Sequence, residues 1–138
     1  MLQKNVIVDV RGINDGEINF SSEKGVLVEQ EGCTTITYDE TSMDGEGNVK
    51  TNIIIEGEKI TIKKSGDVTS EMIFEVGSIH ASNYVTPYGK FQTEILTKSV
   101  SINREEIFSA EIDYLLSFGG TDSHCNVKIE VSEEKEDI

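Results

Sequence analysis

An unbroken alternation of apolar and polar side chains marks the stretch Cys125-Asn126-Val127-Lys128-Ile129-Glu130-Val131. Successive side chains of a β-strand point to opposite faces, so this alternation predicts a strand with one buried and one solvated face. The same pattern, rich in β-branched residues, recurs outward from this stretch along nearly the whole chain, whereas helical spacing is scarce. We therefore predict an all-β protein with little or no helix.

Glycine-bearing turn signals separate the alternating runs. Short turns of this kind predict successive antiparallel hairpins, and a spacing of about 8–12 residues is typical of a sandwich or barrel. About ten strands are near the limit for one open sheet, and closure removes the exposed edges. We predict a single antiparallel β-barrel domain over residues 1–132, followed by an acidic, solvated and frayed tail at 133–138.

Composition narrows the classes of partner. The 138-residue chain carries a formal charge of −14, which repels phosphate backbones and anionic lipids, so we expect neither nucleic acid nor a membrane as partner. No stretch approaches the roughly 20 apolar residues of a bilayer span, and no secretory signal is visible at the N-terminus. Cys33 and Cys125 lack the spacing of a redox or metal motif, so we expect a cytoplasmic protein.

Small hydroxyl residues interrupt several apolar faces. We expect a strand at Val68–Val76 whose inward residues include Ser70 and Val76. Thr51 likewise precedes two inward isoleucines. Thr93 and Thr97 flank Ile95 in the same way. Such positions either leave room and hydrogen-bonding groups for a small ligand, or are good strand formers in a filled core. The tight packing of protein interiors favours the filled core.

Pro87, the single proline of the chain, lies in the hexapeptide Tyr84-Val85-Thr86-Pro87-Tyr88-Gly89. Because proline cannot donate to a sheet ladder, it must stand at an edge, bulge or strand end. Tyr84, Thr86 and Tyr88 share one face if the segment is extended. We favour a corner at the barrel rim, where Pro87 ends the ladder and Gly89 permits the turn. In the alternative, Tyr84 and Tyr88 join Lys64 in contacting a small anionic or aromatic ligand at a barrel mouth.

Catalytic patterns are scarce in this sequence. Thr121-Asp122-Ser123-His124-Cys125 contains nucleophile and base residue types, but adjacent strand residues face opposite ways and cannot converge on one substrate. His80 and His124 each lack a partner at metal-ligand spacing. We therefore expect no enzyme, no catalytic residues, no metal and no cofactor.

Several stretches together resemble the YwiB-like family of small bacterial proteins, which is catalogued as a domain of unknown function. The specific element is the hexapeptide that contains Pro87; strand patterns such as Ile60–Gly66 and Met72–Glu75 support it. The resemblance extends from about Val6 to Val131 and implies a calycin-like (lipocalin-like) β-barrel, but no activity or catalytic residue. Lys64 stands where the family often has arginine. The chain has no tryptophan, so the Gly-x-Trp motif of lipocalins is missing and their ligand chemistry is not carried over.

Two functional hypotheses follow. The first is a non-enzymatic binding module for a small, partly apolar ligand, which would contact Tyr84, Thr86, Tyr88, Lys64, Ser70, Thr93 and Thr97. The alternative is a structural or protein-interaction module that acts as a homo-oligomer with a filled barrel core. Apolar residues on both faces of some strands, such as Ile53 with Ile54 and Ile95 with Leu96, motivate this alternative.

Overall fold

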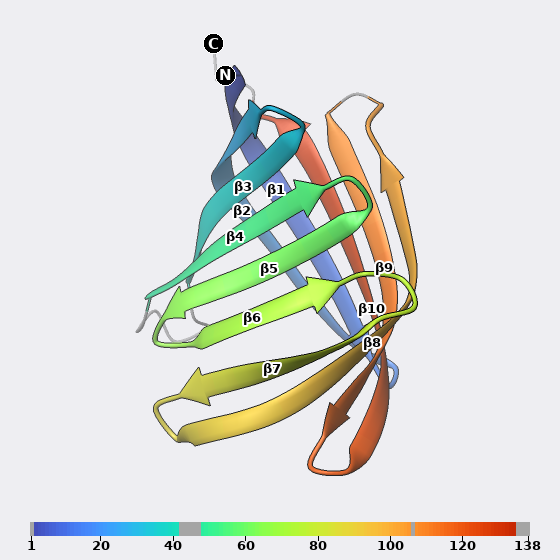
Figure 1. Ribbon diagram of the computed structural model, residues 1–138. Helices are drawn as coiled ribbons and strands as arrows, with labels where there is room; N and C mark the ends of the chain where they lie inside the picture. Colours follow the sequence, from blue (N-terminus) through green and yellow to red (C-terminus); the bar gives the residue numbers. More distant parts are fainter. Residues whose placement is uncertain (1, 42–47, 106, 135–138) are drawn as a thin grey trace.

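The computed structural model describes residues 2–41, 48–105 and 107–134, and this part of the chain forms ten β-strands and no helix (Figure 1). Each strand pairs antiparallel with the next along the chain, and the first pairs with the last, so the sheet closes into a barrel. The predicted all-β barrel of about ten strands is therefore confirmed. The strands are β1 (Leu2–Asn14), β2 (Glu17–Gln30), β3 (Cys33–Thr41), β4 (Asn48–Glu56), β5 (Lys59–Gly66), β6 (Thr69–Phe74), β7 (Ile79–Thr86), β8 (Gly89–Asn103), β9 (Phe108–Phe118) and β10 (Thr121–Glu133).

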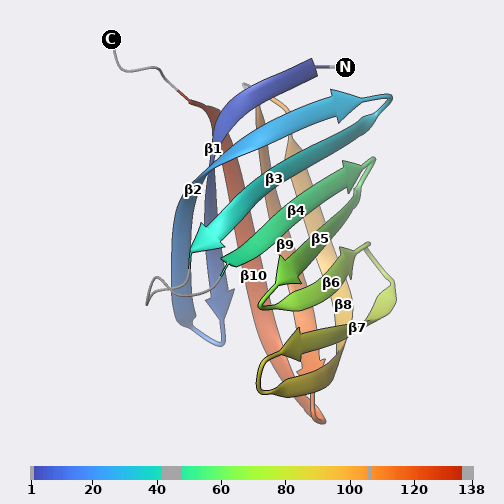
Figure 2. The ribbon, with the colours of Figure 1, turned by 90° about the vertical axis from the view of Figure 1, so that its left-hand side faces the viewer.

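The barrel has two ends of different character. One end, which we call the terminal end, holds both chain termini and the turn between β2 and β3 (Figures 1 and 2). At the other end, the Pro87 end, the β7–β8 and β9–β10 hairpins reach furthest from the termini. The described residues include no helix long and apolar enough to cross a bilayer.

The interior holds one cluster of apolar side chains contributed by nearly every strand. β-Branched residues predominate, as expected for side chains that pack on a pleated surface. Val6, Ile36, Ile55 and Ile60 are among those with no exposed surface. Phe74 packs edge-on against Tyr114 with ring centroids 4.9 Å apart. Apolar burial of this extent is the dominant favourable contribution to folding.

Two local features interrupt the regular ladders, and a third brings two strands unusually close. Pairing between β6 and β7 is limited to Thr69 with Val85 and Ser70 with Tyr84; beyond these pairs, the Ser82 hydroxyl donates to the Glu71 carbonyl at 2.5 Å. The β8–β9 register shifts between Thr97 and Ser99. At Gly25, a Cβ atom would stand 2.7 Å from the Thr37 carbonyl oxygen, so only glycine lets β2 approach β3 this closely.

Two predicted boundaries compare with the structure as follows. β6 ends at Phe74, so the prediction that Val76 is an inward strand residue is wrong: Val76 lies in the connection to β7 and is 54% exposed. At the C-terminus β10 runs to Glu133, and the Glu134 amide donates to the Asn5 carbonyl at 3.1 Å. The rest of the predicted tail, residues 135–138, lies outside the described residues.

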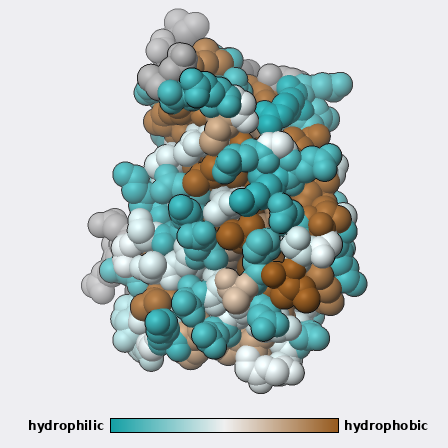
Figure 3. Space-filling view, viewed as in Figure 1, coloured by the Kyte–Doolittle hydropathy of each residue, from teal (hydrophilic) through white to brown (hydrophobic). Residues whose placement is uncertain are grey.

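The outer surface is mixed in polarity. Figure 3 shows apolar side chains in separate patches between hydrophilic ones on the face seen in Figure 1. The outer wall thus resembles an ordinary solvated sheet surface, on which single exposed apolar residues are normal.

Candidate functional site

A continuous row of inward side chains crosses five neighbouring strands at the Pro87 end. Each member is the direct register partner of the next, so neighbouring side chains lie within contact range. We call this set the polar row, and it consists of Tyr38 (β3), Thr51 (β4), Lys64 (β5), Ser70 (β6) and Tyr84 (β7). The row therefore brings together three of the predicted site residues: Lys64, Ser70 and Tyr84.

An ion pair fixes the centre of the polar row. The Lys64 ammonium donates to both carboxylate oxygens of Glu40, at 3.3 and 3.2 Å, and the two side chains are 30% and 27% exposed. The Tyr38 hydroxyl donates to the same carboxylate at 3.5 Å. Burial raises the pKa of Tyr38, and the charge of Glu40 raises it further, so this phenol stays protonated at neutral pH.

Thr51 has an unusual position within this row. Its side chain is fully buried between Tyr38 and Lys64, and its hydroxyl Oγ1 makes no hydrogen bond of good geometry among the described residues, although it lies close enough to the Tyr38 hydroxyl to lower the pKa of that phenol slightly against the effect of burial. A buried polar atom left unpaired costs about 1–3 kcal/mol. The polar row thus holds a hydroxyl that can both donate to and accept from an additional group.

Two other predicted hydroxyls lie away from the row. Thr97 on β8 is 1% exposed and faces Tyr114, and its Oγ1 also lacks a partner within the described part of the chain. Thr93 is half-buried, and its hydroxyl donates to the Ser82 carbonyl at 3.2 Å. Thr97 is therefore an interior residue next to Tyr114, whereas Thr93 ties β8 to β7.

The turn around Pro87 keeps the remaining two predicted site residues, Thr86 and Tyr88, out of the polar row. β7 ends at Thr86 and β8 begins at Gly89, so Pro87 ends the ladder as the corner interpretation expects. Thr86 Oγ1 accepts the Tyr88 amide at 3.1 Å, and Gly89 has φ 147°, a conformation that favours glycine. Tyr88 lies in the turn and is 95% exposed. The prediction that Tyr88 shares a face with Tyr84 required an extended strand through Tyr88. The chain turns there instead, and Tyr88 points away from the polar row.

Aromatic residues line the inner side of the Pro87 end, which we call the mouth. Tyr84 pairs in register with Phe91, and the Phe91 ring lies 5.4 Å from the ring of Phe118. These three inward positions are 38%, 37% and 46% exposed, unlike the fully buried apolar residues deeper in the barrel. The mouth thus offers aromatic surface directly beside the polar row.

Comparison with known proteins identifies the family. A family model described as "Domain of unknown function (DUF1934)" matches residues 7–130, which is most of the chain. The chain belongs to the DUF1934 family. Its fold is similar to the crystal structure of the ywiB protein from Bacillus subtilis, with a TM-score of 0.80 and 18% identity over 96% of this chain and 94% of that one. No curated protein matches the sequence.

The predicted resemblance to the YwiB-like family is therefore confirmed. At 18% identity the structural match shows a shared fold, and the family description assigns no activity to DUF1934. The calycin-like class of the barrel and the roles of the seven predicted site residues stay predictions.

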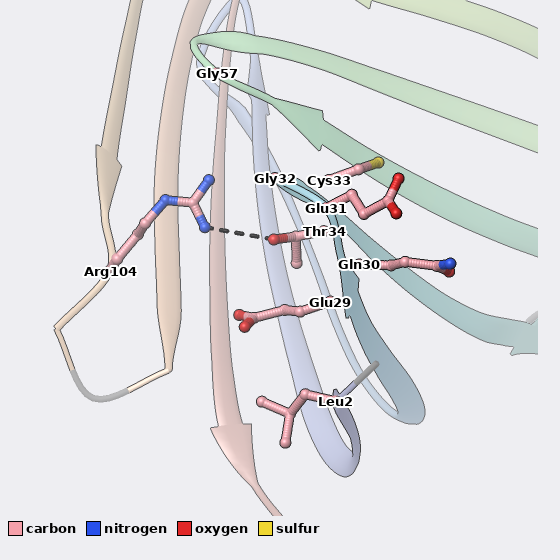
Figure 4. A pocket seen from close by; sticks show the side chains of 9 residues that line it. All are labelled: Leu2, Glu29, Gln30, Glu31, Gly32, Cys33, Thr34, Gly57 and Arg104. Carbon is pink, nitrogen blue, oxygen red and sulfur yellow. Dashed lines mark hydrogen bonds between the residues drawn. The ribbon is translucent and has the colours of Figure 1, made fainter.

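A hollow opens at the terminal end of this DUF1934 barrel. It has a volume of about 600 Å³, and Figure 4 shows Arg104 reaching across it so that its guanidinium donates to the Thr34 hydroxyl at 3.4 Å. Glu29 and Leu2 lie on the same side, whereas Cys33 and Glu31 point the other way in this view. Arg104 already serves a structural contact here, and its partner Thr34 was not predicted from the sequence.

His124 has a partner in the structure that was not predicted from the sequence. His124 Nε2 lies 2.8 Å from Asp113 Oδ1, but His124 is on the outer wall with its side chain 59% exposed. No group of three or more metal-ligating side chains occurs in the described ranges. The pair joins β9 to β10 and does not face the mouth.

Four members of the site were not singled out from the sequence as ligand contacts: Glu40, Tyr38, Phe91 and Phe118. Strand parity alone places Glu40 on the face of Tyr38, two residues apart. What the sequence lacked was the register of β3, β4 and β5, which brings Glu40 within reach of Lys64.

Proposed function

We propose that this DUF1934 protein is a non-enzymatic binding module that holds a small, partly apolar molecule at the Pro87 end. The observation that carries the proposal is the fully buried hydroxyl of Thr51, which makes no hydrogen bond of good geometry among the described residues, beside a mouth of partly exposed inward aromatics. A ligand hydroxyl or amine that reaches Thr51 would remove an unfavourable contribution of about 1–3 kcal/mol. Its apolar part would cover Tyr84, Phe91 and Phe118.

The packed interior limits where the ligand can lie. Ile36, Ile53, Ile62 and Met72 fill the layer next to the polar row, so the ligand would rest on this layer and not pass through it. Small-molecule sites combine apolar surface with a few placed polar groups, which is the composition of the mouth and the polar row.

Chemistry at the mouth supports binding more than catalysis. The carboxylate of Glu40 is engaged by Lys64 and Tyr38, and the His124–Asp113 pair lies on the outer wall. We further propose a cytoplasmic location, which the free thiols of Cys33 and Cys125 support.

Native mass spectrometry of gently purified protein is the first test, with 2-(1-naphthyl)ethanol as a neutral fluorescent probe in a second measurement. We expect a retained small molecule or saturable probe binding, and Thr51→Val should weaken probe binding about fivefold because one hydrogen bond is lost. Thr35→Val, on the outward face of β3, is the matched control and should bind as the wild type does. A clean apo mass together with no probe binding would sink the proposal.

Self-association is a second candidate function, favoured by two exposed residues on the outer face of β2. Ile18 and Phe20 are 57% and 68% exposed, and the register partners of β2 on β3 begin only at Gly25. Light scattering across a wide concentration range should show a dimer that Phe20→Ser dissociates. A monomer at every concentration would exclude this role.

A further inference from the structure

Charge around the polar row is not balanced. Among the residues that the structure describes, three charged side chains at inward strand positions lie in it or next to it: Glu23, Glu40 and Lys64. Glu23 faces inward, because its register partner is the fully buried Val8. Beyond the Gly25–Tyr38 pair, Glu23 and Glu40 are the next inward residues on β2 and β3. Two carboxylates therefore face one ammonium.

The single ammonium is already engaged. Lys64 donates to both oxygens of Glu40, whereas Glu23 has no hydrogen bond or ion pair in the part of the chain that the structure describes. Burial raises the pKa of the Tyr38 phenol, and the charges of Glu40 and Glu23 both add to the effect, which is consistent with the two carboxylates lying near it. An anionic ligand would have to compete with Glu40 for Lys64 and would meet Glu23.

The aromatic side chains at the mouth also favour a positively charged ligand. The faces of Tyr84, Phe91 and Phe118 carry negative π-density, which attracts an ammonium group as well as packing against an apolar body. The chain as a whole has a formal charge of −14, so its field attracts cations from solution.

We propose that the ligand of this site is an organic cation, an amine carried on an aromatic or otherwise apolar body. Its ammonium would lie near Glu23 and Glu40 with Thr51 as a hydrogen-bond partner, and its body would rest on Tyr84 and Phe91. This inference rests on the proposed function and narrows it. It also differs from the alternative raised from the sequence, in which Lys64 joins Tyr84 and Tyr88 in contacting a small anionic or aromatic ligand.

Three probes with one ring system test the inference by fluorescence titration: 2-(1-naphthyl)ethylamine, 2-(1-naphthyl)ethanol and 1-naphthylacetic acid. We expect the amine to bind at least about tenfold more tightly than the acid, with the alcohol between them. If the acid binds as tightly as the amine, the inference is wrong while the proposed function stands. If none of the three binds, both are wrong.

Two matched variants distinguish the effect of the local carboxylate from the effect of the net charge of the whole protein. Glu23→Gln removes the unpartnered inward carboxylate and should lower the preference for the amine over the acid about fivefold. Glu71→Gln removes one exposed charge from the outer face of β6 and should leave the preference unchanged. Equal effects of the two variants would show that the field of the whole protein sets the preference, which would overturn the inference. Thermal melts of both variants confirm that they fold.

Discussion

Two neighbouring rows of side chains cross the same four strands, β3 to β6, and differ completely in chemistry. Both face inward, and both follow the register of the same ladders. The first four members of the polar row are Tyr38, Thr51, Lys64 and Ser70; the apolar row, two residues along each strand toward the terminal end, is Ile36, Ile53, Ile62 and Met72. One backbone therefore supports a packed layer and a polar layer side by side. The comparison teaches that depth along the barrel, more than strand identity, decides whether an inward row is apolar or polar.

The largest contrast should appear on truncation in the apolar row. Ile53 is 1% exposed, so Ile53→Ala should lower the free energy of unfolding by about 2–5 kcal/mol through lost burial and a residual cavity. Ile54→Ala, on the outer face of the same strand, is the control and should lose less than half as much. Urea denaturation measures both, and equal losses would contradict the assignment of inner and outer faces.

Alkaline pH should destabilise the protein through buried phenols. Burial raises the pKa of both Tyr38 and Tyr114 above the ordinary 10.0. The folded state then holds these protons more tightly than the unfolded state, so their contribution is fully present below pH 10.0 and declines above it. Each such phenol lowers the free energy of unfolding by up to about 1.4 kcal/mol per pH unit in that range.

Urea midpoints at about pH 9 and about pH 11 test this pH dependence. Tyr38→Phe removes one of the two phenols and should lose less stability between these values than the wild type. Tyr88→Phe, at the exposed turn, should behave as the wild type does. The prediction fails if the two variants respond alike.

Loss of the ion pair should have a smaller effect. Lys64→Met leaves the half-buried Glu40 carboxylate without its cation, and we expect a loss of about 1 kcal/mol, between the values for exposed and buried pairs. Lys63→Met alters the exposed outward neighbour and should change stability by less than about 0.5 kcal/mol. Chemical denaturation at neutral pH distinguishes the two, and an equal loss in Lys63→Met would contradict a special role for Lys64.

The smallest effect should be at Thr51, where replacement of the hydroxyl is expected to help. Thr51→Val removes a buried, unpartnered polar atom at nearly constant volume, so stability should rise by zero to about 1 kcal/mol. Thr37→Val is the contrast, because the Thr37 hydroxyl donates to Asn52 at 2.7 Å, and it should cost about 1 kcal/mol. A clear loss of stability in Thr51→Val would mean that its hydroxyl has a partner in the folded protein.

Sequence reasoning predicted the barrel because its signals are local. Period-two alternation and glycine turns act within a few residues, and closure follows from strand number and the avoidance of free edges. Pro87 was also placed correctly at the end of a ladder, since proline cannot donate to one.

The polar row could not be predicted from the sequence, because it depends on the register between neighbouring strands. Lys64, Ser70 and Tyr84 meet only through the β5–β6 and β6–β7 registers, and the latter consists of two residue pairs. Tyr88 could not be placed by parity because two turn residues interrupt the strand there. The alternation within one segment does not show which residue of another strand a side chain will contact. Glu40, the ion-pair partner of Lys64, is an example.

The pairing of the first strand with the last has a consequence for synthesis of the chain on the ribosome. β1 forms nine register pairs with β10, from Val6 with Glu133 to Asn14 with Cys125. One edge of β1 therefore stays unpaired until β10 has been translated. Unpaired edges recruit other strands, so the nascent protein is open to aggregation until β10 has been made and the barrel can close.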